Sequence, residues 1–229
     1  MLILSLDTST RSCSVAVHQS NQLLACYALF TDKSSSGMLT TLIQNTVEHT
    51  GFQLSDIDVI AVAKGPGSYT GLRIATSTVK GLCFALDKPL VAINTLHAMA
   101  AQLSGSLPTD YLLCPMIDAR RMEVFCGVFD QNLNIVQDTQ AMVIDENSFL
   151  ELLTTQKIVF FGDGAEKCKT TLGNSPNAVF IETQIYPSAK TVGELALKAI
   201  DSQQFEDIET FEPFYLKDFV GTTPRVKSE

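Results

Sequence analysis

Two apolar segments that each end at an aspartate are the feature that most constrains the fold of this 229-residue chain. Residues 2–6 run into Asp7, and residues 112–117 run into Asp118 in the second half of the chain. Apolar positions that follow the two aspartates also share their offsets: Cys13, Val15 and Val17 correspond to Val124, Cys126 and Val128. A repeat whose two copies each take up about half of the chain predicts two structurally similar halves.

Strands and helices alternate in the predicted order of elements. Strands are predicted at 2–6, 13–18, 23–30, 59–63, 90–93, 112–117 and 157–161, and helices at 36–50, 72–86 and 192–200. Short connections between alternating elements favour α/β lobes with mostly parallel sheets. The linker-like composition of residues 104–110 separates an N-terminal lobe, predicted at 1–104, from a C-terminal lobe, predicted at 110–229.

Composition excludes several classes of protein. The six cysteines lack CxxC spacing, so we interpret them as reduced thiols of a cytoplasmic protein. No apolar run approaches the roughly 18 residues of a membrane span, and no membrane association is expected. The net charge of −9 repels a polyphosphate backbone, so we expect any nucleic acid to be held mainly by another subunit.

A glycine-rich loop, AKGPGSYTGLR, occupies residues 63–73. It is not a Walker A motif, because no Gly-Lys-Ser/Thr follows its glycines. Gly65 and Gly67 permit backbone turns that other residues disfavour, and Thr70 is a natural N-cap for the helix that carries Arg73. An anion could bind the free N–H groups of such a loop, whereas a turn with a helix cap needs no ligand. The residues alone leave both interpretations open.

Five motifs together resemble the bacterial TsaB (YeaZ) family: LSLDTST, AKGPGSYTGLRIATSTVKGL, MIDARRMEVF, FGDGA and EPFYLKDF. The resemblance implies the two-lobed α/β fold of actin, Hsp70 and sugar kinases, and a role in making threonylcarbamoyladenosine in tRNA. It implies a noncatalytic, dimerising subunit that pairs with the catalytic homologue TsaD, in an assembly that also contains the small ATPase TsaE. The chain alone would form a homodimer, and tRNA would be bound mainly through TsaD.

The same resemblance bears on nucleotide binding, because actin-like enzymes wrap nucleotide phosphates with an Asp-x-Gly-x-Thr hairpin. This chain keeps Asp7 and Thr10 but has Ser9 at the glycine position, so we interpret the hairpin as tied by local hydrogen bonds. We expect no cofactor on the isolated chain. Adenine nucleotide is expected only within the assembly, at six residues: Asp7, Thr10, Gly65, Gly67, Gly162 and Gly164.

Metal binding is also not expected. TsaD holds its metal with a His-x-x-x-His pair, and the corresponding positions here are Thr95 and Met99. The lone His97 fits neither position and is interpreted as a surface or interface residue. The segment from Asp118 is interpreted as a tight hairpin with an ion pair between Arg120 and Glu123, in preference to an acid–base site.

A partner surface is predicted on two helices. Apolar residues of the helix predicted at 36–50 spread beyond one narrow stripe, and the resemblance implies that two helices of each subunit pack as a bundle. The predicted interface residues are Met38, Leu39, Leu42, Thr70, Arg73 and Thr78. The alternatives are an active nucleotide-dependent small-molecule kinase of the same fold, which would turn over ATP alone, and a free-standing homodimeric regulator, which would not co-purify with TsaD.

Overall fold

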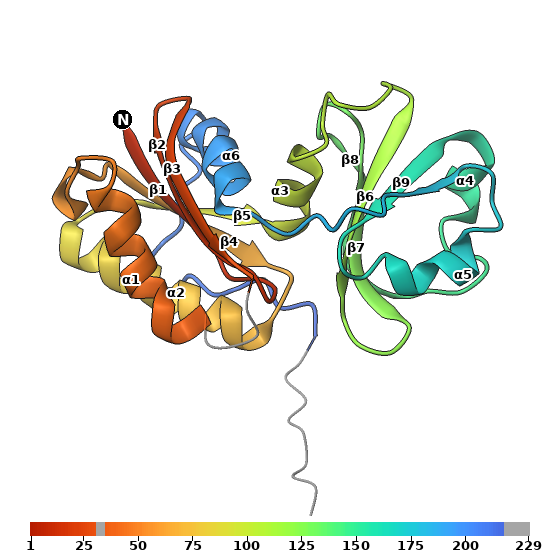
Figure 1. The fold of residues 1–229 in the computed structure, drawn as a ribbon, viewed down its shortest axis with the longest axis horizontal. Coiled ribbons are helices and arrows are strands. Elements are labelled where there is room, and N and C mark those ends of the chain that lie inside the picture. The colour runs from red at the N-terminus through yellow and green to blue at the C-terminus, as the bar shows by residue number, and fades with distance from the viewer. Residues whose placement is uncertain (31–34, 218–229) are drawn as a thin grey trace, which may run out of the picture.

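The computed structural model describes residues 1–30 and 35–217, which form two five-stranded sheets (Figure 1). The last two residues of the EPFYLKDF motif, Asp218 and Phe219, and Ser34 before the first helix lie outside the described residues. The first sheet contains β1 (Leu2–Asp7), β2 (Cys13–Gln19), β3 (Gln22–Leu29), β4 (Val59–Gly65) and β5 (Leu90–Asn94). The second contains β6 (Tyr111–Asp118), β7 (Glu123–Phe129), β8 (Ile135–Val143), β9 (Lys157–Phe161) and β10 (Ala178–Phe180).

The two sheets repeat the same strand order. The first runs β3-β2-β1-β4-β5 and the second, taken from its β8 edge, runs β8-β7-β6-β9-β10. In each sheet the first strand pairs antiparallel with the second and parallel with the fourth. The duplication predicted from the two aspartate-ending strands is therefore confirmed.

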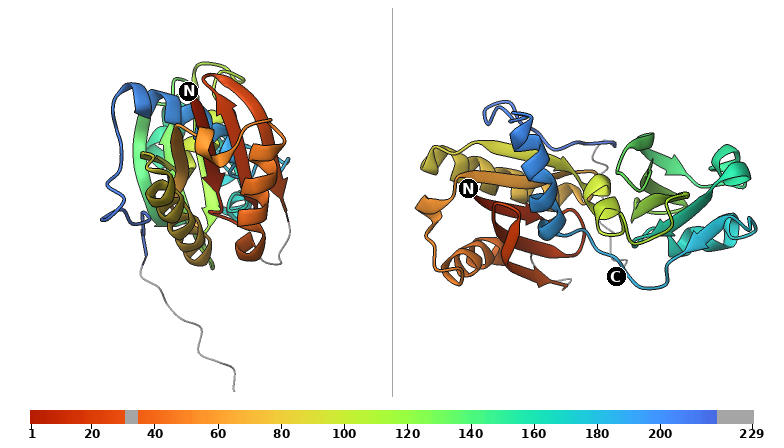
Figure 2. Two further views of the ribbon diagram at one scale, coloured as in Figure 1. Left: turned by 90° about the vertical axis from the view of Figure 1, so that its left-hand side faces the viewer. Right: turned by 90° about the horizontal axis from the view of Figure 1, so that it is seen from above.

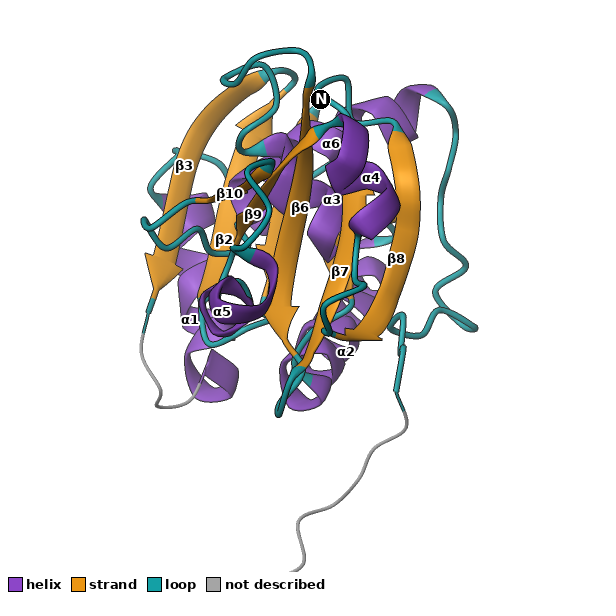
Figure 3. Ribbon diagram, turned by 90° about the vertical axis from the view of Figure 1, so that its right-hand side faces the viewer, coloured by secondary structure: helices purple, strands orange, loops and turns teal. Residues whose placement is uncertain are grey.

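Helices cover both faces of each sheet. On the first sheet, α1 (Ser35–Glu48) and α2 (Tyr69–Leu86) pack on one face, and α6 (Ala189–Asp201) packs on the other (Figures 1 and 2). On the second sheet, α4 (Leu150–Thr155) and α5 (Lys169–Leu172) lie on the outer face (Figure 3). The short α3 (Thr95–Ala101) lies between the two sheets and contacts α6. Among the described residues, no helix is long and apolar enough to cross a membrane.

Side chains that point alternately to the two faces of the first sheet build the core of the first half. In β1, Leu2, Leu4 and Leu6 join the cluster under α1 and α2, whereas Ile3 joins the cluster under α6. Side chains of a strand point to opposite faces in turn, so one apolar strand can bury residues under helices on both sides. This explains why β1 is apolar at almost every position and buried along its whole length.

The last helix crosses back from the second half to the first. The hydroxyl of Ser5 donates to the carbonyl of Ala189 at 2.8 Å, and the N–H of Ala189 donates to the hydroxyl of Ser14 at 2.8 Å. The helix also lies so close to β2 that a Cβ on Gly193 would be 2.4 Å from His18 Nδ1. The lobe limits 1–104 and 110–229 stay a prediction, and α6 is a part of the chain after 110 that packs on the first sheet.

Candidate functional site

The hairpin between β1 and β2 is closed by its own side chains. Asp7 Oδ1 accepts hydrogen bonds from the Ser9 N–H at 2.9 Å and from the Ser9 hydroxyl at 2.6 Å. The hydroxyls of Thr10 and Ser12 lie 3.0 Å apart and share a hydrogen bond. Asp7 is fully buried, and its second oxygen, Oδ2, has no hydrogen-bond partner. Burial raises the pKa of Asp7 from 3.8 to about 6, although the hydrogen bonds from Ser9 oppose this rise.

The glycine-rich loop lies directly against this hairpin. The Ser68 N–H donates to the Ser9 carbonyl at 2.6 Å, and the Thr8 hydroxyl donates to the Gly71 carbonyl at 2.7 Å. A Cβ on Gly67 would be 2.2 Å from the Ser9 carbonyl oxygen, and one on Gly71 would be 2.0 Å from that of Thr8. Both positions therefore need glycine because two backbone segments touch there. The loop changes the chain direction between β4 and α2 and packs against the hairpin. We call this contact, between residues 67–71 and residues 8–9, the clasp.

The cap of α2 differs from the prediction. The N-cap is Ser68, whose hydroxyl accepts from the Gly71 N–H at 3.2 Å, whereas Thr70 is exposed in the first turn. The assignment of Thr70 as N-cap was wrong because the helix begins earlier than the apolar pattern indicated. Arg73 is exposed on the same helix, with its guanidinium 4.8 Å from the ring centroid of Tyr69.

The backbone conformation and close packing at position 65 also require glycine. Its φ of +111° lies in a region that favours glycine, and a Cβ there would be 2.9 Å from the Phe214 carbonyl oxygen. The Phe214 N–H donates to the Lys64 carbonyl at 2.7 Å. The C-terminal segment of the described chain is thus held against the end of β4.

The hairpin does not fit the phosphates of a nucleotide. Phosphate binding needs free, solvent-reachable N–H groups, but the Ser9 N–H is used by Asp7, and Asp7, Thr8 and Ser9 are buried. A metal-bound nucleotide also needs an ionised, accessible carboxylate, and burial disfavours that form of Asp7. Adenine nucleotide at Asp7, Thr10, Gly65 and Gly67 within an assembly stays a prediction.

Gly162 and Gly164 are also explained by close backbone packing. Gly162 has a φ of +100°, and a Cβ there would be 2.3 Å from the Met116 carbonyl oxygen. A Cβ on Gly164 would be 2.9 Å from the backbone carbon of Ile117. The glycines let the chain after β9 pass over β6, and adenosine contact at this place stays a prediction.

The two positions that would carry metal-binding histidines, Thr95 and Met99, lie on α3 and are buried. Thr95 is buried, and its hydroxyl accepts from the Gly65 N–H at 3.1 Å. Met99 is buried against the glycine turn after β9. His97 is half-buried and stacks on Phe129 with 5.3 Å between ring centroids, so it is not a fully exposed surface residue, and its interface role stays a prediction. Within residues 1–30 and 35–217, no group of three or more His, Cys, Asp or Glu side chains could hold a metal ion.

The hairpin between β6 and β7 is organised by Lys167. Its ammonium group pairs with Asp118 and donates to the carbonyls of Arg121 at 2.7 Å and Glu123 at 2.8 Å. The carboxylate of Glu123 pairs with Lys217. The predicted ion pair between Arg120 and Glu123 was wrong, because the lysine from the C-terminal segment takes that carboxylate.

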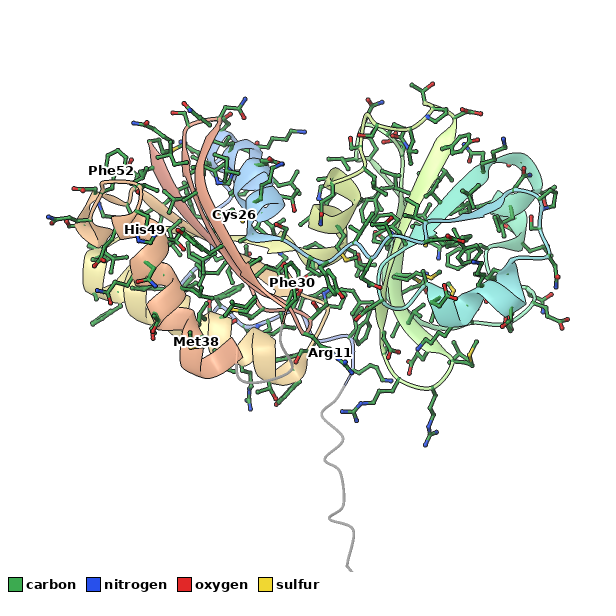
Figure 4. The ribbon with its side chains drawn as sticks, in the orientation of Figure 1. Arg11, Cys26, Phe30, Met38, His49 and Phe52 are labelled. Carbon is green, nitrogen blue, oxygen red and sulfur yellow. The ribbon has the colours of Figure 1, made fainter. Side chains whose placement is uncertain are left out.

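The predicted partner helices present different residues from those expected. Leu39 is fully buried and Leu42 is 7% exposed, so both are core residues under the first sheet and their prediction as interface residues was wrong. Met38 is 42% exposed, and it projects from the first turns of α1 (Figure 4). Thr78 is half-buried. The interface role of Met38, Thr70, Arg73 and Thr78 stays a prediction.

One exposed apolar residue of α2, Phe84, was not among the predicted residues. It lies near the end of α2 and is 82% exposed, the largest exposed fraction among the large apolar side chains of the described chain. Helical spacing places it with Arg73, Ser77 and Gly81, opposite the buried Val79 and Cys83. This spacing was the available signal, because an aromatic residue outside the apolar stripe of a helix is not part of the core packing.

A family model and two curated relatives that match this chain are named for threonylcarbamoyl modification of tRNA. Residues 30–222 match the family model described as TsaD, tRNA N6-adenosine threonylcarbamoyltransferase. The tRNA threonylcarbamoyladenosine biosynthesis protein TsaB of Bacillus subtilis is 31% identical over 168 residues, which cover 71% of this chain and 71% of that protein. The Escherichia coli TsaB is 26% identical over 227 residues and 96% of each chain.

A solved structure, YeaZ from Pseudomonas aeruginosa, matches the fold with a TM-score of 0.78 at 24% identity, covering 94% of this chain and 99% of that chain. The fold class predicted from the sequence, two duplicated α/β lobes, is confirmed by the repeated strand order and by this match.

Proposed function

Because the chain belongs to the TsaB (YeaZ) family of tRNA threonylcarbamoyladenosine biosynthesis proteins, we propose that it is a noncatalytic subunit that binds TsaD. In this role it supports the transfer of the threonylcarbamoyl group to an adenosine of tRNA. TsaE enters the same assembly through the pair, and TsaD makes the main contact with tRNA. A second copy of the chain covers the same surface when TsaD is absent.

The observation that carries the noncatalytic part is the clasp between the glycine-rich loop and the first hairpin. The Ser68 N–H and the Thr8 hydroxyl donate to backbone carbonyls across this contact. The Ser9 N–H and hydroxyl both donate to Asp7 Oδ1, so neither is free to bind a phosphate. These bonds fill the place where related enzymes bind phosphates. The same packing disfavours the alternative of a small-molecule kinase, which needs that place open.

The exposed faces of α1 and α2 support the partner-binding part. Phe84 presents a whole aromatic ring to solvent on the same face of α2 as Arg73. Met38 adds a second exposed apolar side chain from α1. Exposed aromatic residues, arginine and methionine are the side chains enriched at the centres of protein interfaces. We therefore assign TsaD binding to this face.

The test is replacement of Phe84 by aspartate, followed by co-purification with TsaD from the same organism. Because Phe84 makes little contact with the core, the variant is expected to keep its melting temperature. Its affinity for TsaD is expected to fall by at least about 30-fold, the usual loss at an interface hot spot.

A matched control is Ile135→Asp, which alters another exposed apolar residue, 62% exposed, at the edge of the second sheet. It is expected to pair with TsaD like the unmodified chain. Normal pairing by Phe84→Asp, or loss of pairing by Ile135→Asp, would move the interface away from α1 and α2.

A further inference from the structure

The turn between β6 and β7 carries two adjacent arginines in an unfavourable backbone conformation. Arg120 has a φ of +71° and Arg121 a φ of +47°, and both side chains are exposed. Left-handed conformations disfavour residues with a Cβ, and glycine and asparagine adopt them most readily. Non-glycine residues held in such conformations gather at functional sites.

The acidic groups around this turn are already neutralised by lysines. Asp118 pairs with Lys167, and Glu123 pairs with Lys217. Within residues 1–30 and 35–217, neither Arg120 nor Arg121 has a carboxylate within ion-pair distance of its guanidinium group. Two positive charges therefore face solvent on a chain whose net charge is −9.

The backbone of the turn is held rigidly by its neighbours. Lys167 binds the carbonyls of Arg121 and Glu123, and the Arg120 N–H donates to Asp118 Oδ1 at 3.0 Å. Asp163 Oδ1 accepts from the Asp118 N–H at 2.9 Å and fixes the end of β6. A supported turn presents both guanidinium groups from one place, which lowers the entropic cost of binding a ligand.

A third arginine lies on the facing hairpin. Arg11 is labelled between the two halves of the molecule in Figure 4, beside the end where the β6–β7 turn projects. Its charge acts on Asp163, whose pKa is raised mainly by burial and is lowered in part by Arg11 and Lys167. The ends of both hairpins thus contribute positive charge to the same end of the molecule.

We propose that Arg120 and Arg121 bind the phosphate backbone of tRNA as a secondary contact of the assembly. This inference rests on the proposed function, which brings tRNA to the chain through TsaD. Guanidinium groups match phosphate oxygens with two parallel hydrogen bonds, and backbone contacts position RNA without reading its sequence. Two such contacts are too few for strong binding by an acidic chain alone, but they add to the affinity of an assembly.

The main experiment measures tRNA binding by the reconstituted assembly of this chain, TsaD and TsaE across a range of salt concentrations. The double variant Arg120→Asn/Arg121→Gly removes both charges and installs residues that the turn accepts. It is expected to pair normally with TsaD and to weaken tRNA binding several-fold at low salt. The slope of log affinity against log salt concentration should fall in magnitude by about one to two.

A matched control removes two lysines that are already paired with carboxylates. Lys169→Asn/Lys190→Asn also removes two positive charges, but from lysines outside the turn that pair with Glu182 and Glu194. It is expected to leave the salt slope unchanged. Equal losses in both double variants would show a general charge effect and overturn the proposal. Loss of TsaD pairing by the arginine variant would assign the turn to an acidic protein surface and overturn it as well.

A second measurement separates this proposal from the proposed function. The isolated chain is titrated with tRNA at low salt while backbone amide shifts are recorded. Shifts centred on residues 118–123 that disappear in the arginine variant are expected, whether or not the chain pairs with TsaD. Absence of shifts at this turn would overturn the RNA contact, whereas failure of the unmodified chain to pair with TsaD would overturn only the proposed function.

Discussion

The two hairpins that follow β1 and β6 occupy equivalent places in the repeated sheets but have opposite surroundings. The first, from Asp7 to Ser12, is largely buried and clasped by the backbone around Gly67 and Gly71. The second, from Asp118 to Glu123, is largely exposed and is held mainly by the side chain of Lys167. Duplication thus preserves strand order, while a few residues decide whether a turn packs or faces solvent.

The largest effect is expected where the first hairpin is clasped. Replacing Gly71 by alanine would place a Cβ 2.0 Å from the Thr8 carbonyl oxygen, so the loop and hairpin must separate. We expect a loss of at least about 3 kcal/mol in the free energy of unfolding, measured by urea denaturation.

The control for this prediction lies in the same helix. A Cβ on Gly81 would meet nothing within 4 Å, so Gly81→Ala should stabilise the isolated chain by about 0.5–1 kcal/mol through helix propensity. If Gly71→Ala were as stable as Gly81→Ala, the clasp between hairpin and loop would not exist as described.

The next largest effect concerns the buried carboxyl of the first hairpin. Asp7 has its pKa raised from 3.8 to about 6, so the folded state binds more protons than the unfolded state between these values. Its ionisation therefore costs stability above about pH 6, by at most about 3 kcal/mol. We expect Asp7→Asn to raise the free energy of unfolding at pH 7.5 by about 1–3 kcal/mol, and the gain to shrink as the pH falls toward 4.

Urea denaturation between pH 4 and pH 8 tests whether Asp7→Asn raises the free energy of unfolding and whether the gain shrinks at low pH. The comparison with the second hairpin is direct, because Asp118 is exposed and paired with Lys167. Asp118→Asn is expected to lose stability at neutral pH. A destabilised Asp7→Asn at pH 7.5 would mean that the charged carboxylate has a favourable partner.

The smallest effect is expected at the tip of the second hairpin. Arg121 has a φ of +47°, which glycine adopts without steric cost, so Arg121→Gly should be neutral or should stabilise the fold by about 1 kcal/mol or less. Thermal melting is sufficient to measure it. A clear loss of stability would show that the Arg121 side chain makes contacts that hold the turn.

The sequence predicted the central strands well because they are buried on both faces. Continuous apolar runs located β1, β4, β5, β6 and β9, and the offsets from the two aspartates matched apolar residues of β7 to those of β2. The edge strand β8 was missed, because Ile135, Val136 and Val143 are exposed and its apolar residues do not alternate clearly. The crossing of α6 to the first sheet has no local signal, because it depends on which surface is left uncovered.

The candidate site was less predictable than the fold. Helical spacing placed the apolar residues Leu39 and Leu42 on a helix, but it could not tell which side of α1 would pack against the sheet. The glycines of the loop were correctly associated with turns, whereas their contact with the Thr8 and Ser9 carbonyls joins segments far apart in sequence. Phe84 was identifiable from spacing alone, since it lies opposite the buried residues of α2.

The central claim, that this chain supports transfer without performing it, is tested most directly in a reconstituted reaction. Threonylcarbamoyl transfer to tRNA is measured with TsaD and TsaE from the same organism, with the unmodified chain, with Asp7→Asn, or without the chain. We predict that the reaction needs the chain and that Asp7→Asn supports a rate within about twofold of the unmodified chain, because Asp7 does not touch the reacting groups. Loss of transfer with Asp7→Asn, while folding and TsaD pairing stay intact, would contradict this account and make the first hairpin catalytic.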